Sequence, residues 1–84
     1  MRDTLRSPRQ QQLRALLRSL RERRGLTQTD VADRLARTQS FVAKYEGGER
    51  RLSVIEFIDV VRALDAKPSD VLQELIKVVD RAKR

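Results

Sequence analysis

The segment from Thr27 to Gly48 constrains the fold more than any other part of the chain. Thr27 and Thr38 each precede a short run in which apolar residues recur at helical spacing, and a threonine hydroxyl can accept hydrogen bonds from a first helical turn. Asp30 can reach back to Thr27 in a variant of the capping box. The first run ends near Ala36 and the second ends at a glycine pair. This pattern predicts two short helices joined by a tight turn.

Helices are also predicted before and after this segment. Ser7 and Pro8 open the first one, because serine caps a helix and proline suits its first position, and Gly25 ends it. Its apolar stripe comprises Leu13, Leu16, Leu17 and Leu20. Ser53 and Glu56 form a capping box ahead of a fourth helix. The apolar residues of that helix are Ile55, Phe57, Ile58, Val61 and Leu64.

A fifth helix is expected over residues 69–81, after a break at residues 65–68 that ends in proline. Ser69 is expected to cap it. Its apolar residues are Val71, Leu72, Leu75, Ile76, Val78 and Val79. No segment alternates apolar and polar residues as a half-buried strand would. The sequence therefore predicts one all-α domain of five helices over residues 1–84, with a short basic arm at residues 1–7.

The residue types exclude several classes of function. The chain has no cysteine and no histidine, so it lacks disulfides, thiolate metal ligands and the commonest general base. We therefore expect no enzyme, no cofactor and no metal site. No apolar run approaches the ~20 residues that span a membrane, and the arginines near the N-terminus precede no hydrophobic stretch of a signal peptide. We expect a cytoplasmic protein with no membrane partner and no small-molecule effector.

The positive charge lies in the first three-fifths of the chain. Residues 1–51 contain 13 basic and 6 acidic residues, a net charge of +7, whereas residues 52–84 contain 6 of each. Basic residues that only decorate solvated helices could give the same count. The uneven distribution nevertheless favours one half that faces a polyanion.

The predicted third helix has the layout of a helix that enters the major groove of DNA. Val42, Tyr45 and Glu46 share one side of it, and Ser40 and Lys44 lie nearly opposite, flanked by Gln39. A glutamine can form two hydrogen bonds to adenine, and a lysine can reach a guanine edge or a phosphate. We predict base contacts from the three residues Gln39, Ser40 and Lys44. Contacts to phosphates of the DNA backbone are predicted for Thr27, Gln28, Arg37, Arg50 and Arg51.

Residues 13–72 resemble the phage Cro and lambda-type repressor family of helix-turn-helix proteins, often called XRE-like. The matching positions are Gln28, Val31, Ala32, Leu35, Val42, Tyr45, Glu46, Gly48, Ala63 and Leu64. The resemblance implies a lambda-repressor-like fold in which the second and third helices, residues 27–48, bind double-stranded DNA.

The resemblance also implies roles for single residues. It implies a buried ion pair between Arg21 and Glu46, phosphate binding by Gln28, and base contacts at Gln39, Ser40 and Lys44. The sequence departs from the family where Ala36 and Asp65 replace common glycines. A left-handed backbone is expected at both positions, with mild strain at the alanine.

Some assignments stay open from sequence alone. Phe41 can pack in the core or touch a thymine methyl group. Four apolar residues of the fifth helix exceed the needs of a four-helix core, and they can form a homodimer interface or be covered by the first helix. These are Leu75, Ile76, Val78 and Val79. The predicted homodimer interface comprises Leu72, Leu75, Ile76 and Val79. The expected function is a transcription regulator that binds a short inverted repeat as a homodimer. An antitoxin-type protein that mainly binds a protein partner is the alternative.

Overall fold

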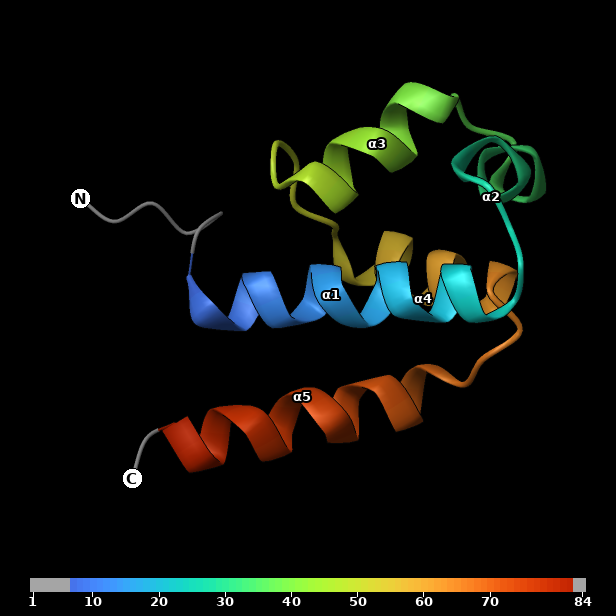
Figure 1. Cartoon of the computed structure of the whole chain (residues 1–84). Coiled ribbons are helices and arrows are strands. Elements are labelled where there is room, and N and C mark those ends of the chain that lie inside the picture. The colour runs from blue at the N-terminus through green and yellow to red at the C-terminus, as the bar shows by residue number, and fades with distance from the viewer. Residues whose placement is uncertain (1–6, 83–84) are drawn as a thin grey trace.

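The computed structural model describes residues 7–82, with side-chain detail through residue 77. These residues form five α-helices and no strand (Figure 1). The helices are α1 (Pro8–Arg23), α2 (Gln28–Leu35), α3 (Gln39–Gly47), α4 (Val54–Ala63) and α5 (Pro68–Ala82). None of the helices in residues 7–82 has the length and apolar character needed to cross a membrane. The predicted all-α class and five-helix order are confirmed.

Helix α1 occupies the middle of the domain. Figure 1 shows α3 on one side of α1 and α5 on the opposite side, and α1 packs against both. Helix α2 packs against α3 and α4, and α4 packs against α5. Side chains from all five helices meet in one core, which consists of Leu17, Val31, Ala32, Phe41, Val42, Tyr45, Phe57, Val60, Val61, Leu64 and Val71. Phe41 belongs to this core, as its 6% exposure shows.

The predicted caps form at the starts of four helices. The Ser7 hydroxyl accepts the amide of Gln10 at 3.1 Å, and the Thr38 hydroxyl accepts the amide of Phe41 at 3.2 Å. Thr27 and Asp30 form a reciprocal capping box, with bonds of 3.0 and 2.8 Å. Ser53 and Glu56 form a second reciprocal capping box, with bonds of 3.1 and 2.9 Å. These caps fix where the chain enters each helix.

The predicted cap of α5 is wrong by two positions. The helix begins at Pro68 rather than residue 69, so Ser69 lies inside its first turn. The carbonyl of Lys67 accepts the amides of Asp70 and Val71 at 3.0 and 3.3 Å. Proline has its φ already set for the first helical position and lacks the N–H that a cap would need to satisfy there. The helix ends at Ala82, one residue beyond the predicted end.

Two non-glycine residues within residues 7–82 have a left-handed backbone, as the sequence predicted. Ala36 has a φ of 57° and Asp65 a φ of 58°. After Ala36, the backbone amide of Arg37 donates a hydrogen bond to the carbonyl of Ala32 at 2.9 Å. After Asp65 the chain makes an equivalent bond, at 3.1 Å, to the carbonyl of Val61. Both helices thus end in the hydrogen-bond pattern that usually employs glycine.

Candidate nucleic-acid interface

Helix α3 divides sharply into a buried side and an exposed side. Phe41, Val42 and Tyr45 are buried, and the Tyr45 ring meets the Phe41 ring edge to face with centroids 5.4 Å apart. Burial raises the pKa of the Tyr45 phenol, so this side chain stays neutral in the core. Gln39, Ser40 and Lys44 are all exposed. The buried side fixes the rotation of α3, and that rotation turns three polar side chains toward solvent.

A chain of side-chain contacts runs from α1 to the start of α3. The Arg21 guanidinium donates two hydrogen bonds to the Glu46 carboxylate, at 2.7 and 3.1 Å. The amide nitrogen of Gln28 donates to the same carboxylate at 3.0 Å. The amide nitrogen of Gln39 in turn donates to the Gln28 oxygen at 2.8 Å. These four residues, which we call the glutamine relay, connect three helices.

The ion pair at the base of the glutamine relay is largely shielded from water. The side chains of Arg21 and Glu46 are only 12% and 5% exposed. The hydrogen bond from Arg21 to Glu46 raises the pKa of the guanidinium above its usual range. Arg21 also donates to the carbonyl of Leu26 at 2.8 Å, which ties the loop after α1 to the same pair. A shielded, doubly hydrogen-bonded pair is a rigid anchor for the groups attached to it.

The chemistry of the glutamine relay determines which way its amides point. A carboxylate only accepts hydrogen bonds, so Gln28 must turn its NH2 group toward Glu46. The Gln28 oxygen then faces Gln39 and accepts a hydrogen bond from one of the two N–H groups of the Gln39 amide. Gln39 keeps one N–H and its carbonyl oxygen for another partner. One donor beside one acceptor is the pattern that pairs with an adenine edge.

The arginines on both sides of α3 differ in how they are held. Arg37 and Arg50 both place their guanidinium groups over the Phe41 ring, at 3.9 and 4.9 Å from its centroid. Both also contact the carboxylate of Glu56. Arg51 is exposed, and its side chain makes no hydrogen bond or ion pair with the part of the chain that the structure describes. Sequence reasoning named the three arginines and missed the carboxylate that holds two of them.

The start of α2 contributes two further groups to this side of the molecule. The Thr27 hydroxyl accepts the amide of Asp30 as a cap, which leaves its own proton available to a second acceptor. Gln28 is half-buried because both ends of its amide are engaged within the glutamine relay. Its contribution to the site is therefore mainly to orient Gln39.

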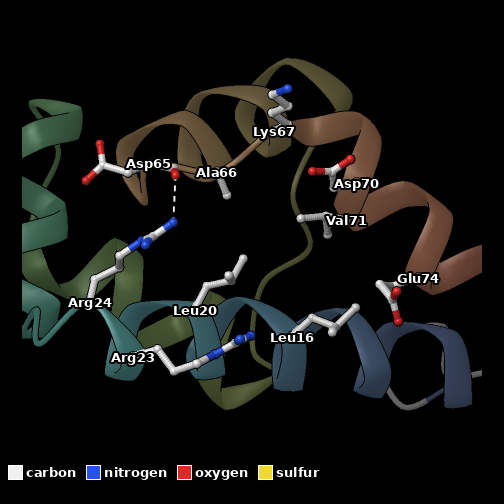
Figure 2. Close-up of a pocket in the computed structure, with 10 residues that line it drawn as sticks. All are labelled: Leu16, Leu20, Arg23, Arg24, Asp65, Ala66, Lys67, Asp70, Val71 and Glu74. Carbon is white, nitrogen blue, oxygen red and sulfur yellow. Dashed lines mark hydrogen bonds between the residues drawn. The ribbon is translucent and has the colours of Figure 1, made fainter.

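A groove lies between α1 and α5 (Figure 2). Figure 1 shows that α5 lies on the side of α1 opposite α3. The volume of the groove is about 390 Å³. Leu16 and Leu20 of α1 and Val71 of α5 point into it, and charged groups of both signs line its edges. Arg24 donates to the carbonyls of Leu64 and Asp65 at 2.9 and 2.7 Å, which closes one end.

The exposed face of α5 carries apolar side chains that α1 does not cover. Leu72 and Ile76 are 46% and 56% exposed, whereas Leu75 is half-buried. The side chain of Val79, also predicted at an interface, lies outside the described residues. Outside α5, Val54 and Ile55 at the start of α4 are also exposed, at 73% and 67%. Helix α1 therefore leaves Leu72 and Ile76 exposed, so the alternative that the first helix covers the apolar residues of α5 does not apply to these two.

Two short helices at a tight turn, the second with a polar exposed face beside basic residues, define a helix-turn-helix DNA-binding domain. The family model of the helix-turn-helix domain matches residues 12–75. A comparison with curated proteins found no match. Among solved structures, an XRE-family like protein from Pseudomonas syringae pv. tomato is 46% identical, with a TM-score of 0.81 over 83% of this chain and 85% of that one. The chain belongs to the XRE-like helix-turn-helix family.

Two structures with lower identity share the same architecture. The clp gene regulator ClgR from Corynebacterium glutamicum is 28% identical, with a TM-score of 0.75 over 86% of this chain and 94% of that one. The restriction-modification controller protein C.AhdI from Aeromonas hydrophila is 29% identical, with a TM-score of 0.69 over 74% of this chain and 94% of that one. The names of both proteins describe regulators.

Proposed function

We propose that this chain is a transcription regulator that reads a specific double-stranded DNA sequence with α3. The observation that carries the proposal is the orientation of Gln39, whose amide is held by the glutamine relay on the exposed face of the helix. A side chain that is already oriented loses little freedom on binding, so its hydrogen bonds discriminate well between bases. Ser40 and Lys44 are the other two base-reading residues of this proposal.

The phosphate contacts of the proposal come from both ends of the helix-turn-helix. At the start of α2, Thr27 contributes its hydroxyl and Gln28 its backbone N–H, because free N–H groups of a first helical turn favour an anion. Arg37, Arg50 and Arg51 flank α3. The net charge of +7 in residues 1–51 supports this assignment, because phosphate neutralisation supplies most of the sequence-independent affinity of DNA-binding proteins.

We further propose that two copies of the chain bind together, through α5. Exposed Leu72 and Ile76 lie one turn apart on that helix, and Leu75, next to Ile76 in the sequence, is half-buried. Val79 is the fourth residue predicted for this interface. Apolar side chains that remain exposed on one helix face favour association, and two-fold pairing is the commonest form. A dimer of this kind presents two recognition helices to half-sites about one turn of DNA apart, roughly 34 Å.

The same experiment tests sequence reading and pairing. Bound duplexes are selected from a random DNA library by the wild-type chain and by Gln39→Ala. We expect the wild type to enrich an inverted repeat and the variant to lose preference at one position of each half-site. Enrichment of a single, non-repeated site contradicts the pairing, and an unchanged motif with Gln39→Ala contradicts the role of Gln39. Failure to enrich any sequence contradicts sequence-specific binding itself.

A further inference from the structure

Glu56 is an acidic residue that lies among arginines, and three groups contact its carboxylate. Its carboxylate accepts two hydrogen bonds from Arg50, with N–O distances of 2.9 and 3.0 Å. Arg37 lies 3.5 Å from one of the same oxygens. The backbone amide of Ser53 donates to the other at 2.9 Å. One carboxylate thus binds two of the three arginines that flank α3.

The same two arginines are restrained a second time by an aromatic ring. Phe41 is the third residue of α3 and directly follows Gln39 and Ser40. The guanidinium of Arg37 lies 3.9 Å from the centroid of its ring, and that of Arg50 lies 4.9 Å away. Cations over aromatic faces are held more firmly when the surroundings are partly shielded from water. We call Arg37, Phe41, Arg50 and Glu56 the arginine cluster.

The two guanidinium groups of the arginine cluster are restrained by their contacts but remain exposed to solvent. The Arg37 and Arg50 side chains remain 42% and 38% exposed, and each guanidinium has five N–H donors, not all of which the carboxylate engages. The cluster contains two positive charges and one negative charge. Both arginines therefore stay available to a phosphate, in fixed positions and with part of their charge neutralised.

From this geometry we infer that Glu56 sets the specificity of DNA binding by restraining Arg37 and Arg50. A mobile arginine can follow the phosphates of any duplex, and it adds affinity that is independent of sequence. A restrained arginine meets a phosphate only where the DNA backbone passes at the right place, as it does when α3 is correctly seated. Glu56 acts through the two arginines, so it is a positioning residue. This inference rests on the proposed function.

Glu56→Gln separates the charge of Glu56 from its role as a cap. The glutamine oxygen still accepts the amide of Ser53, whereas the attraction for both arginines is lost. The binding of each protein is measured at 50–200 mM salt to a random-sequence 30-base-pair duplex and to the duplex selected by the wild type. We expect Glu56→Gln to bind the random duplex several-fold more tightly than the wild type, with a salt slope steeper by about one. We also expect its affinity for the selected duplex to exceed its affinity for the random duplex by a smaller factor than in the wild type.

Glu49→Gln is the matched control, because it makes the same change of charge one residue before Arg50. Glu49 is exposed, and its side chain makes no ion pair with residues 7–77. We expect Glu49→Gln to change the random-duplex affinity less than half as much as Glu56→Gln on a logarithmic scale. Equal effects of the two substitutions would show that only net charge matters, and would overturn the role assigned to Glu56.

A double-mutant cycle with Arg50→Gln tests whether Glu56 acts through an arginine. We expect Glu56→Gln to have a smaller effect in the Arg50→Gln background than in the wild type, and equal effects overturn the inference. Equal losses on both duplexes, together with a lower thermal midpoint, would assign Glu56 a structural role and also overturn it. A wild type that binds neither duplex overturns the proposed function as well, whereas wild-type binding with an unchanged slope in Glu56→Gln overturns only the inference.

Discussion

Some single side chains in this domain both stabilise the fold and position the groups that we propose contact DNA. Glu46 pairs with a shielded arginine and also orients Gln28, which orients Gln39. Glu56 caps α4 and also holds Arg50. Neither carboxylate is itself among the proposed DNA contacts. Substitutions at these two positions are therefore expected to affect stability and binding together.

Replacing Glu46 with alanine is expected to destabilise the domain by about 3–5 kcal/mol, because it leaves the shielded Arg21 charge without its partner. Urea unfolding followed by circular dichroism measures this cost. Glu22→Ala is the control, since Glu22 pairs with Arg18 on the surface, where both side chains are more than half exposed. Its expected cost is below about 1 kcal/mol. Similar costs for the two substitutions would contradict a shielded pair.

The pH dependence of stability is expected to reveal the Glu56 carboxylate. The hydrogen bonds from Arg50 and from the Ser53 amide lower its pKa from 4.5 to about 2. Folding therefore favours the ionised form, and this contribution is complete above pH 4.5 and is lost as the pH falls toward 2. The difference in unfolding free energy between wild type and Glu56→Gln should be constant above about pH 5 and shrink below it. A difference that does not vary with pH contradicts the lowered pKa.

For individual helices, the sequence predicted what local chemistry determines. The caps at Ser7, Thr27, Thr38 and Ser53 depend on residues within one turn, and all four form. The start of α5 was misplaced because Ser69 and Pro68 both carry helix-start signals, and proline has the stronger positional requirement. Both are adjacent in sequence, so the pattern alone could not rank them.

Contacts between helices could be predicted only in part. The pairing of Arg21 with Glu46, 25 residues apart, follows from the family resemblance and is present in the structure. The sequence did not predict the hydrogen bond from Gln39 to Gln28 or the ion pair between Arg37 and Glu56. Long side chains have many rotamers, and only the packed arrangement of α2, α3 and α4 selects the ones that meet. The exposure of Ile55 likewise depends on which face of α4 its neighbours cover.

The end of α2 is expected to become more stable when Ala36 is replaced with glycine. A left-handed conformation costs an alanine about 1–2 kcal/mol, and the greater freedom of glycine in the unfolded chain returns roughly 0.4–1 kcal/mol of this. A net gain of about 0.5–1 kcal/mol is expected in urea unfolding. Asp65→Gly provides the comparison. Its gain should be smaller, because aspartate tolerates this backbone better and Asp65 contacts Arg34 at 3.2 Å. A loss of stability in Ala36→Gly contradicts strain at the turn.

The domain as a whole separates its two proposed surfaces. Helix α3, which carries Phe41 of the arginine cluster, lies on one side of α1, and α5 lies on the other (Figure 1). The groove lies between α1 and α5. The core between the two proposed surfaces is a single cluster of apolar side chains. A change on the outer face of α5 should therefore alter the proposed association of two copies without altering the face of α3 that is proposed to contact DNA.

Pairing through α5 is expected to fail when Leu72 and Ile76 are both replaced with glutamate. Two charges on the proposed interface would have to lose their hydration when the copies meet. Sedimentation velocity at micromolar concentration is expected to show a dimer for the wild type and a monomer for the double variant. Gln73→Glu adds charge next to this face and is the control. A wild-type monomer at these concentrations, or a double variant that remains dimeric, contradicts the proposed interface.

The bond between Gln28 and Gln39 has a consequence for retargeting this protein. A new side chain at position 39 that cannot donate to the Gln28 oxygen leaves that oxygen without its partner, and the freed amide can then rotate away. Successful redesign of the recognition helix should therefore require paired substitutions at positions 28 and 39. Libraries that vary position 39 alone would sample mostly side chains whose orientation nothing in α2 supports.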